Sequence, residues 1–371
     1  WPPPETAPRE AVVFVVIGGS AAHGQVVVDS LQGNGTLTWS APVNSSARYD
    51  IEWAYEAGGP WHKTFQNLQT IDAFNDTQFV ARVPMFFRAV QITNPVPQGM
   101  VFIEGGDTRL GQESFADPGF TNYISPFWID RTEVSIELWR EVYQWSTNHG
   151  YHFDNPGLAK TNGHPVCNIN WYDAVKWCNA RSEKEGLEVV YLAGLFTYRS
   201  NILNTVNMIQ ERNGYRLPTE AEWEKAARGG RTGYRFPWAS QTTSHSNANY
   251  RGKAGILAYD LAPNDQYHPL AEFGLEPYTL PAGSLPPNEF GLHDMAGNLE
   301  EWVWDRSDVR PTTYQINYTG PTDTNNISRV IRGGAWEYDA TYLRNLERIG
   351  ALAWDIGFSK TFGFRTVRSA W

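Results

Sequence analysis

Cysteine and positive charge are scarce in this chain, and each shortage excludes a class of protein. Only two cysteines occur among 371 residues, Cys167 and Cys178, which excludes the disulfide framework of a small secreted domain and a CxxC metal knuckle. Lys and Arg number 30 against 40 Asp and Glu, a net charge of −10. No nucleic-acid partner is expected, since nucleic-acid binding relies on a basic surface. No stretch reaches the ~18 apolar residues of a membrane-spanning segment.

Aromatic residues are abundant instead, at 14% of the chain, and hydrophobic residues make up 41%. This is the composition of a folded protein, and the length indicates two domains or one large domain with an accessory module. The first residue is Trp1, without an initiator methionine. We therefore expect a processed, exported protein that is extracellular or at the cell surface.

Residues 1–95 are predicted to form a small all-β module. Short β-rich runs alternate there with Gly, Pro, Asn and Asp. The segments TLTWSAP, RYDIEWAY and FFRAVQIT resemble core strands of a fibronectin type III-like β-sandwich. The apolar run 11–17, AVVFVVI, is interpreted either as the first strand of this sandwich or as a strand that pairs with a neighbouring copy.

Three helix starts are marked by capping residues in the rest of the chain. Ser135, Asn170 and Thr219 each precede a helical pattern, and Asp173 and Glu222 complete capping boxes with the second and third of them. From about residue 230 onward the chain has few helical periods and many turns. We expect aromatic packing and bound ions to hold that part together.

Seven segments in register together resemble the formylglycine-generating enzyme family, also called the sulfatase-modifying factor family. They include HPVCNINWYDAVKWCN from His164, GYRLPTEAEWEKAARGG from Gly214, NEFGLHDMAGNLEEWVWD from Asn288 and RVIRGGAW from Arg329. The resemblance implies that residues 99–371 form an α+β domain with the C-type lectin-like formylglycine-generating-enzyme fold.

The resemblance also implies where the enzymes bind copper. In the family, two cysteines five residues apart, shortly after the RGG turn, bind copper for the oxidation of a substrate cysteine, and Cu(I) requires soft thiolates. The matching positions here are Tyr338 and Leu343, and no cysteine occurs after Cys178. We therefore expect no copper and none of the family's oxidase chemistry, and we assign no catalytic residue.

Other catalytic chemistries have little support in the sequence. An iron-dependent branch with this fold uses histidines from a helical N-terminal domain, whereas residues 1–95 are predicted to be β, so no iron is expected. The pairs Glu300 with Glu301 and Glu220 with Glu222 offer acid and base groups, but we interpret them as surface charge or capping. An oxidoreductase with an unrecognised active site is the alternative.

One loop has the spacing of a calcium site. Asp294 and Glu301 place two carboxylates around the backbone carbonyls of Gly297 and Leu299, which is the mixture of hard oxygen ligands that Ca²⁺ prefers. The family resemblance implies the same set of ligands. The alternative is a turn stabilised by Asp294 with a solvated Glu301.

The resemblance implies a second calcium site, with side chains from Asn249 and Asp265 and carbonyls from Tyr250 and Tyr267. Either ion would have a structural role, because an ion that binds only the folded state raises its stability. The Glu-Pro-Asn and Gln-Pro-Asp motifs of sugar-binding C-type lectins are absent from the sequence. Calcium-mediated sugar binding is therefore not expected.

If the family's catalytic groove persists as a shape, five residues line it as a ligand or partner surface: Trp336, Tyr338, Asp339, Tyr342 and Trp354. Amphipathic aromatic side chains give a binding face large contact area at low entropic cost. We expect Trp336 and Trp354 to be buried and the other three to be exposed.

The sequence therefore predicts a non-catalytic, exported binding or assembly protein, in one version a structural subunit of a cell-surface filament or layer. Its partner would be a protein or glycan at the cell surface, or copies of itself. A further alternative is a ligand-binding display protein whose C-terminal face, residues 336–360, varies on a fixed scaffold, as in the display proteins of diversity-generating retroelements.

Overall fold

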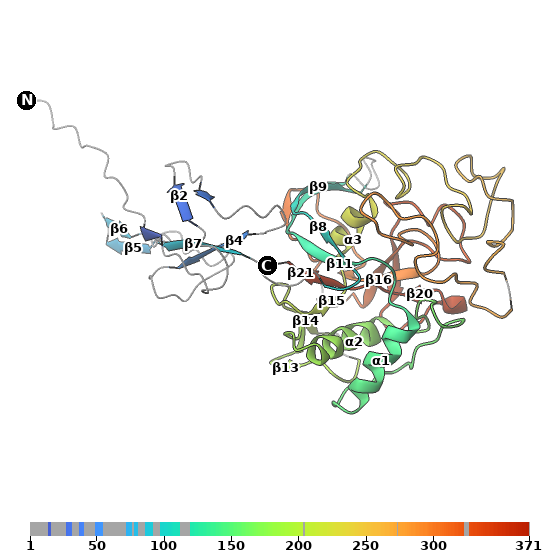
Figure 1. Ribbon diagram of the computed structural model, residues 1–371, viewed down its shortest axis with the longest axis horizontal. Helices are drawn as coiled ribbons and strands as arrows, with labels where there is room; N and C mark the ends of the chain where they lie inside the picture. The colour runs from blue at the N-terminus through green and yellow to red at the C-terminus, as the bar shows by residue number, and fades with distance from the viewer. Residues whose placement is uncertain are drawn as a thin grey trace, which may run out of the picture. The chain divides into compact units, whose positions relative to one another are not determined.

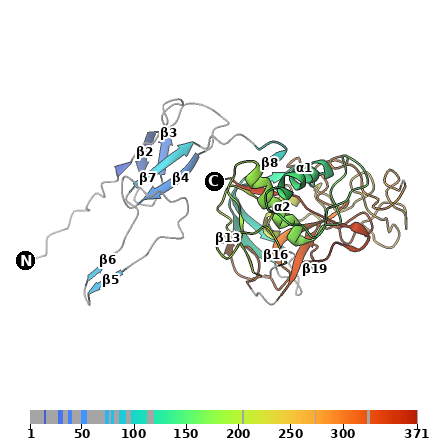
Figure 2. The ribbon, with the colours of Figure 1, turned by 90° about the horizontal axis from the view of Figure 1, so that it is seen from below.

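The chain divides into two compact units, residues 1–96 together with 371 and residues 97–370. Figures 1 and 2 show the computed structural model in two views. The residues that the structure describes are 14–15, 27–31, 37–40, 49–54, 72–75, 78–80, 86–91 and 97–370, without 112–118, 203–204, 273 and 323–325. Each unit is described by itself.

The described part of the N-terminal unit consists of strands. They are β1 (Phe14–Val15), β2 (Val27–Leu31), β3 (Leu37–Ser40), β4 (Tyr49–Ala54), β5 (Asp72–Asn75), β6 (Gln78–Val80) and β7 (Phe86–Gln91). They form a sheet in the order β1-β7-β4 and two hairpins, β2-β3 and β5-β6. Since β1 pairs in parallel with β7 of the same chain, the described part of the run 11–17 is a strand of its own sheet. The fibronectin type III-like sandwich stays a prediction.

The second unit combines three helices with short strands. The helices are α1 (Ile136–Thr147), α2 (Trp171–Lys184) and α3 (Glu220–Ala227), with a 3₁₀ turn, η1, at Phe358–Lys360. The strands are β8 (Met100–Ile103), β9 (Gly106–Leu110), β10 (Phe120–Ile124), β11 (Phe127–Asp130), β12 (Tyr191–Ala193), β13 (Phe196–Thr197), β14 (Val206–Met208), β15 (Tyr215–Arg216), β16 (Glu300–Arg306), β17 (Gln315–Ile316), β18 (Ser328–Arg332), β19 (Ile349–Leu352), β20 (Phe362–Gly363) and β21 (Val367–Ser369). Within the described residues, no helix has the length and apolar character needed to cross a membrane.

The three predicted helix starts are confirmed. Ser135 accepts a hydrogen bond from the backbone N–H of Leu138, and capping boxes begin α2 at Asn170 and α3 at Thr219. Each cap satisfies backbone N–H groups that the first helical turn leaves without a partner. The helices therefore begin where side-chain chemistry, read from the sequence, places them.

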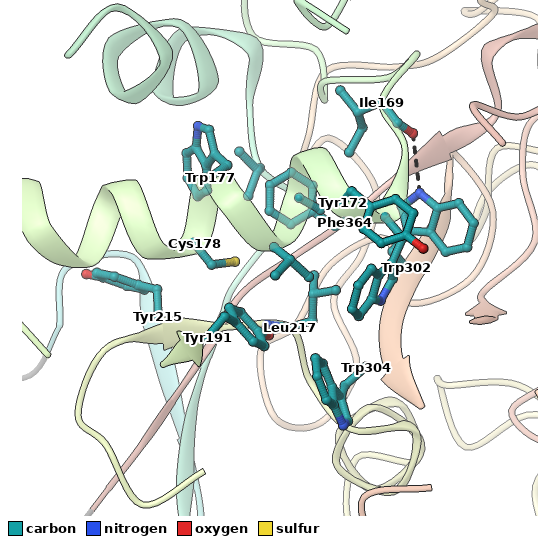
Figure 3. Packing of buried hydrophobic residues seen from close by; sticks show 14 of the residues in the cluster. Ile169, Tyr172, Trp177, Cys178, Tyr191, Tyr215, Leu217, Trp302, Trp304 and Phe364 are labelled. Carbon is teal, nitrogen blue, oxygen red and sulfur yellow. Dashed lines mark hydrogen bonds between the residues drawn. The ribbon is translucent and has the colours of Figure 1, made fainter. Parts of the chain in front are cut away.

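A tryptophan-rich core lies between α2 and the strand β16. Figure 3 shows Trp302 and Trp304 of β16 together with Trp177 and Cys178 of α2. The indole N–H of Trp302 donates to the carbonyl of Ile169, with 3.3 Å between nitrogen and oxygen. Buried indoles need such a partner for their N–H. The two elements are thus joined by apolar packing and by a polar contact.

Two four-stranded sheets position the region of interest. One has the order β15-β21-β11-β8, and the other β19-β18-β16-β20. Because β16 lies inside the second sheet, every residue of this strand is buried, including its two leading glutamates. Between α3 and β16 the described chain contains only turns and isolated bridges, as the turn-rich sequence predicts.

Candidate functional site

The loop after β18 carries Tyr338 and Leu343, the two positions that we matched by sequence to the family's copper-binding cysteines. It begins with a turn at Gly333 and Gly334, which have φ values of 96° and 71°. A Cβ on Gly334 would lie 2.9 Å from both Leu343 Cδ1 and the carbonyl carbon of Tyr342, so the turn requires glycine for its φ and its space. Arg332 anchors the loop: its guanidinium donates to Glu224, at 2.9 Å, and to the carbonyl of Asn345.

Neither replacement residue offers a soft metal ligand. Leu343 is 1% exposed and packs in a small apolar cluster with Phe236 and Tyr250. Tyr338 is half-buried, its ring centroid is 5.0 Å from that of Tyr342, and burial raises its pKa to about 12. A neutral phenol and an isobutyl group do not fit Cu(I).

The two cysteines do not supply the missing thiolates. Both are buried and free, so no disulfide joins them. Burial raises the pKa of Cys167 to about 12 and that of Cys178 as well. A buried, protonated thiol is a poor nucleophile and a poor metal ligand.

The predicted binding surface is partly buried. Trp336 is fully buried, as expected, with its ring 5.7 Å from that of Tyr267 and 5.1 Å from that of Tyr278. Tyr342 is half-buried, and so is Asp339, whose carboxylate accepts the N–H of Thr341 at 2.9 Å. These two and Tyr338 therefore expose only part of the surface predicted for them.

The predicted burial of Trp354 is wrong, because this side chain is 44% exposed. It follows β19 in a turn in which the N–H of Asp355 donates to the carbonyl of Leu352, while the carbonyl of Ala353 accepts the N–H of Trp171. These hydrogen bonds fix the backbone on either side of Trp354, whereas its indole is partly exposed to solvent. Trp354 thus belongs to the surface rather than to the packing beneath it.

The interpretation of Glu300 and Glu301 as surface charge is also wrong, since they are 2% and 0% exposed. Oε2 of Glu300 has no hydrogen-bond partner within the described chain, and neither has Oε2 of Glu337. Burial, reinforced by the neighbouring Asp355 and Glu337, raises the pKa of Glu300 to about 8. Sequence reasoning missed this cluster because Glu300 becomes buried only through its central position in a sheet.

The other pair, Glu220 and Glu222, is buried as well. Glu222 completes the capping box of α3, as predicted, and forms an ion pair with Arg216 at 2.7 Å. Glu220 forms an ion pair with Arg348 at 2.9 Å. Neighbouring arginines, Arg310 first, outweigh burial and lower the pKa of Glu220 to about 2. Both groups are therefore structural carboxylates.

The first predicted calcium loop places Asp294 and Glu301 in the interior. Oδ2 of Asp294 accepts the N–H of Gly283 at 2.7 Å. The carboxylate of Glu301 accepts from the guanidinium of Arg365, at 2.6 to 3.0 Å, and from the indole N–H of Trp223 at 2.8 Å. Because a guanidinium already neutralises Glu301, this arrangement does not fit Glu301 as a calcium ligand.

The backbone ligands proposed for that loop, Gly297 and Leu299, lie in or next to a bend whose N–H groups donate to residues distant in sequence. The N–H of Gly297 donates to Gly333, and the N–H of Leu299 donates to the carboxylate of Glu133 at 3.0 Å. Among the described residues no group of three or more His, Cys, Asp or Glu side chains is arranged to hold a metal ion. Calcium at this loop stays a prediction.

The residues of the second predicted calcium site are held by different partners. Oδ1 of Asn249 is buried and lacks a partner within the described residues, as expected for an oxygen that accepts a cation. The carbonyl of Tyr250 contacts His245 Nε2 at 2.9 Å. Asp265, by contrast, is exposed and pairs with Arg251 at 2.8 Å, and the ring of Tyr267 packs against Trp336. Asn249 fits the site, whereas Asp265 is engaged elsewhere.

Comparison with known proteins identifies the family. Residues 88–370 match the sulfatase-modifying factor enzyme 1-like domain. The chain belongs to this family. Among its relatives are the chaperone protein LppX of Paenibacillus barcinonensis, 33% identical over 248 residues that cover 65% of this chain and 79% of that protein. The formylglycine-generating enzyme of Thermomonospora curvata is 27% identical over 312 residues, covering 69% of this chain and 88% of the enzyme.

Two solved structures agree with the fold. Treponema denticola variable protein 1 superposes with a TM-score of 0.56 and 28% identity, covering 73% of this chain and 94% of that one. CarF superposes with a TM-score of 0.53 and 26% identity, covering 74% of this chain and 99% of its own. The formylglycine-generating-enzyme-like fold predicted from the sequence is therefore confirmed for the second unit.

Proposed function

We propose that this chain is a non-catalytic, exported binding protein on a formylglycine-generating-enzyme-like scaffold. The proposal is carried by the match of the two copper-binding cysteine positions to Tyr338 and Leu343, neither of which is a thiol. Both thiols of the chain are buried and free, and Cys167 lies in the apolar cluster that contains Trp336 and contacts Tyr338. The half-buried tyrosines that follow the RGG turn supply a contact face instead. The relatives named as a chaperone and as a variable protein are compatible with a binding role on this scaffold.

The assembly version of the proposal, a subunit of a filament or layer, has less support. It relied on the run 11–17 pairing with a neighbouring copy, whereas Phe14 and Val15 pair with β7 of the same chain. We therefore favour a surface protein that binds a separate partner. Negative-stain imaging of the purified protein should show isolated particles. If it shows polymers instead, the assembly version is the better proposal.

Copper turnover is the decisive test of the non-catalytic proposal. The protein is loaded with Cu(I) under reducing conditions and given a cysteine-containing peptide, while dioxygen uptake and thiol loss are followed. We expect the rates of dioxygen uptake and of thiol loss to equal those measured with copper and peptide in the absence of the protein. The Y338C/L343C variant restores a thiolate pair and should bind Cu(I), which shows that the assay detects the site. Turnover by the unaltered chain would establish the oxidoreductase alternative.

Calcium as a structural ion is the second part of the proposal. The buried, unpartnered Oδ1 of Asn249 supports an ion near that residue. We expect 1 mM calcium added to chelator-treated protein to raise the melting temperature, because binding to the folded state alone adds RT ln(1 + [L]/Kd) to stability. The variants D265N and D294N separate the two sites, since each should reduce the shift if its carboxylate binds the ion. An unchanged melting temperature in the unaltered protein would reject calcium.

A further inference from the structure

Carboxylates without a basic partner gather beside the aromatic residues of the loop after β18. Glu300 lies within electrostatic reach of Glu337 and Asp355, and Glu337 and Glu276 both act on the phenol of Tyr267. None of the four carboxylates forms an ion pair within the described residues. Because the pKa of Glu300 is about 8, this carboxyl keeps its proton at neutral pH. The negative charge that this part of the chain does not neutralise therefore lies on the other three carboxylates.

The burial of Glu300 distinguishes this cluster from a group of carboxylates on the protein surface. Its side chain is almost fully buried, yet Oε2 has no hydrogen-bond partner in the described chain, and the same holds for Oε2 of Glu337. The Thr361 side chain hydrogen-bonds to the Glu300 carboxyl, so Oε2 is the atom left without a partner. Leaving a buried carboxyl oxygen unsatisfied is costly. The neighbouring Glu301, by comparison, is fully neutralised by Arg365. Two unsatisfied acceptors on adjoining segments are what a site for a cationic group presents before the cation binds.

The aromatic rings around these acids already attract cations of the chain itself. The guanidinium carbon of Arg251 lies 5.3 Å from the ring centroid of Tyr267, and Lys160 Nζ lies 5.4 Å from that of Tyr278. Arg251 is paired with Asp265, and Lys160 donates to the carbonyl of Ala271. Lys360 is a further base of this region, next to Thr361 in sequence. At neutral pH, with Glu300 protonated, this region holds three bases and four ionised acids, Asp265 included, which leaves a small excess of negative charge.

We propose that Glu337, Asp355 and Tyr338, with Glu300 behind them, bind the guanidinium or ammonium group of an arginine or lysine side chain of a partner polypeptide. The inference rests on the proposed binding function and names the chemistry of its partner. Carboxylates form charge-assisted hydrogen bonds to such a group, and tyrosine rings attract it through their electron-rich faces.

The surroundings favour a polypeptide over a free amine. Leu352, Trp354 and Phe358 are 41%, 44% and 81% exposed and lie on either side of Asp355 in sequence. Exposed apolar side chains next to a charged site provide area for the neighbours of a basic residue in a peptide. A small organic cation would use the carboxylates and leave these side chains unused.

The test compares the pentapeptide acetyl-Gly-Leu-Arg-Leu-Gly-amide with its citrulline counterpart, which keeps the shape and loses the charge. Binding to the full chain is measured by isothermal titration calorimetry at 0.15 M salt. We expect saturable binding of the arginine peptide and at least tenfold weaker binding of the citrulline peptide. The E337Q/D355N variant should bind the arginine peptide at least fivefold more weakly than the unaltered protein.

The matched control is E188Q/E211Q, which removes the same charge from two residues outside the cluster, Glu211 being exposed. It should change the affinity less than twofold, because the effect belongs to the site and not to the net charge. Equal losses in both double variants would overturn the inference, as would equal affinity for the two peptides or no binding at millimolar peptide. Methylguanidine binding as tightly as the peptide would overturn the assignment to a polypeptide. All of these failures leave the proposed binding function open to another partner, whereas copper-dependent turnover would reject that function itself.

Discussion

At the scale of single residues, the structure places Glu300 in the interior and the side chain of Trp354 at the surface. The positions of Tyr338 and Leu343 after the RGG turn follow from the sequence alone, and so does the absence of a thiolate there. The burial of Glu300 and the exposure of Trp354 did not follow, because each depends on neighbours distant in sequence. Glu300 is enclosed by the strands on either side of β16, and Trp354 is displaced by a turn whose flanking residues bond to the core.

Asp305 provides the sharpest prediction at this scale. It is 1% exposed, its Oδ2 accepts the N–H of Glu220 at 2.7 Å, and its Oδ1 has no partner within the described residues. Burial, together with the nearby Glu220, raises its pKa from the ordinary 3.8 to about 7. The folded state therefore keeps a proton between about pH 4 and 7 that the unfolded chain has lost. The contribution of Asp305 to the stability of the folded state therefore falls as the pH rises through this window.

We expect the variant D305N to lack this fall, because an amide does not ionise. Relative to the unaltered protein, it should gain on the order of 2 to 4 kcal/mol between pH 4.5 and 8. Urea unfolding midpoints measured across that range give the comparison, with the exposed-site variant E211Q as the control. Parallel pH profiles for D305N and the unaltered protein would show that Asp305 is ionised in the folded state.

At the scale of elements, helix starts could be predicted because their cause is local. A capping box needs only residues three apart, and Thr219 with Glu222 satisfies that condition in sequence and in structure. Strand pairing is different, since β16 adjoins β18 and β20 and their order depends on the whole domain. The calcium loops belong to this second kind. The spacing of their ligands can be found in the sequence. The guanidinium of Arg365 beside Glu301 could not be predicted, because it comes from a segment 64 residues further along the chain.

The cap of α3 can be tested directly. In T219A the N–H of Glu222 loses the Oγ1 acceptor that now lies 3.1 Å away, and we expect a loss of about 1 kcal/mol in the free energy of unfolding. The variant T219S keeps the hydroxyl and should lose much less. If T219S is destabilised as strongly as T219A, the contribution of Thr219 comes from its buried methyl group instead. Chemical denaturation of the full chain measures both variants.

At the scale of the whole molecule, the second unit contains its own core. The buried apolar clusters are made of residues between Met100 and Val367, and the family match, at 88–370, covers the same unit. Its fold could be predicted because several of its motifs are long and occur in a fixed order. The N-terminal unit offered only short strand patterns, which specify β structure without specifying a fold.

We therefore expect residues 97–370, expressed alone, to fold. The fragment should show one cooperative thermal transition, with a melting temperature within about 5 °C of the corresponding transition in the full chain, because hydrophobic burial dominates stability and none of this core is removed. Near-ultraviolet circular dichroism reports the packing of the tryptophans, and its aromatic bands should persist in the fragment. The arginine peptide should bind it as tightly as it binds the full chain, since Glu337, Asp355 and Tyr338 all lie within it. A fragment without a cooperative transition would mean that the N-terminal unit stabilises this domain, and loss of peptide binding by a folded fragment would mean that residues 1–96 take part in the site.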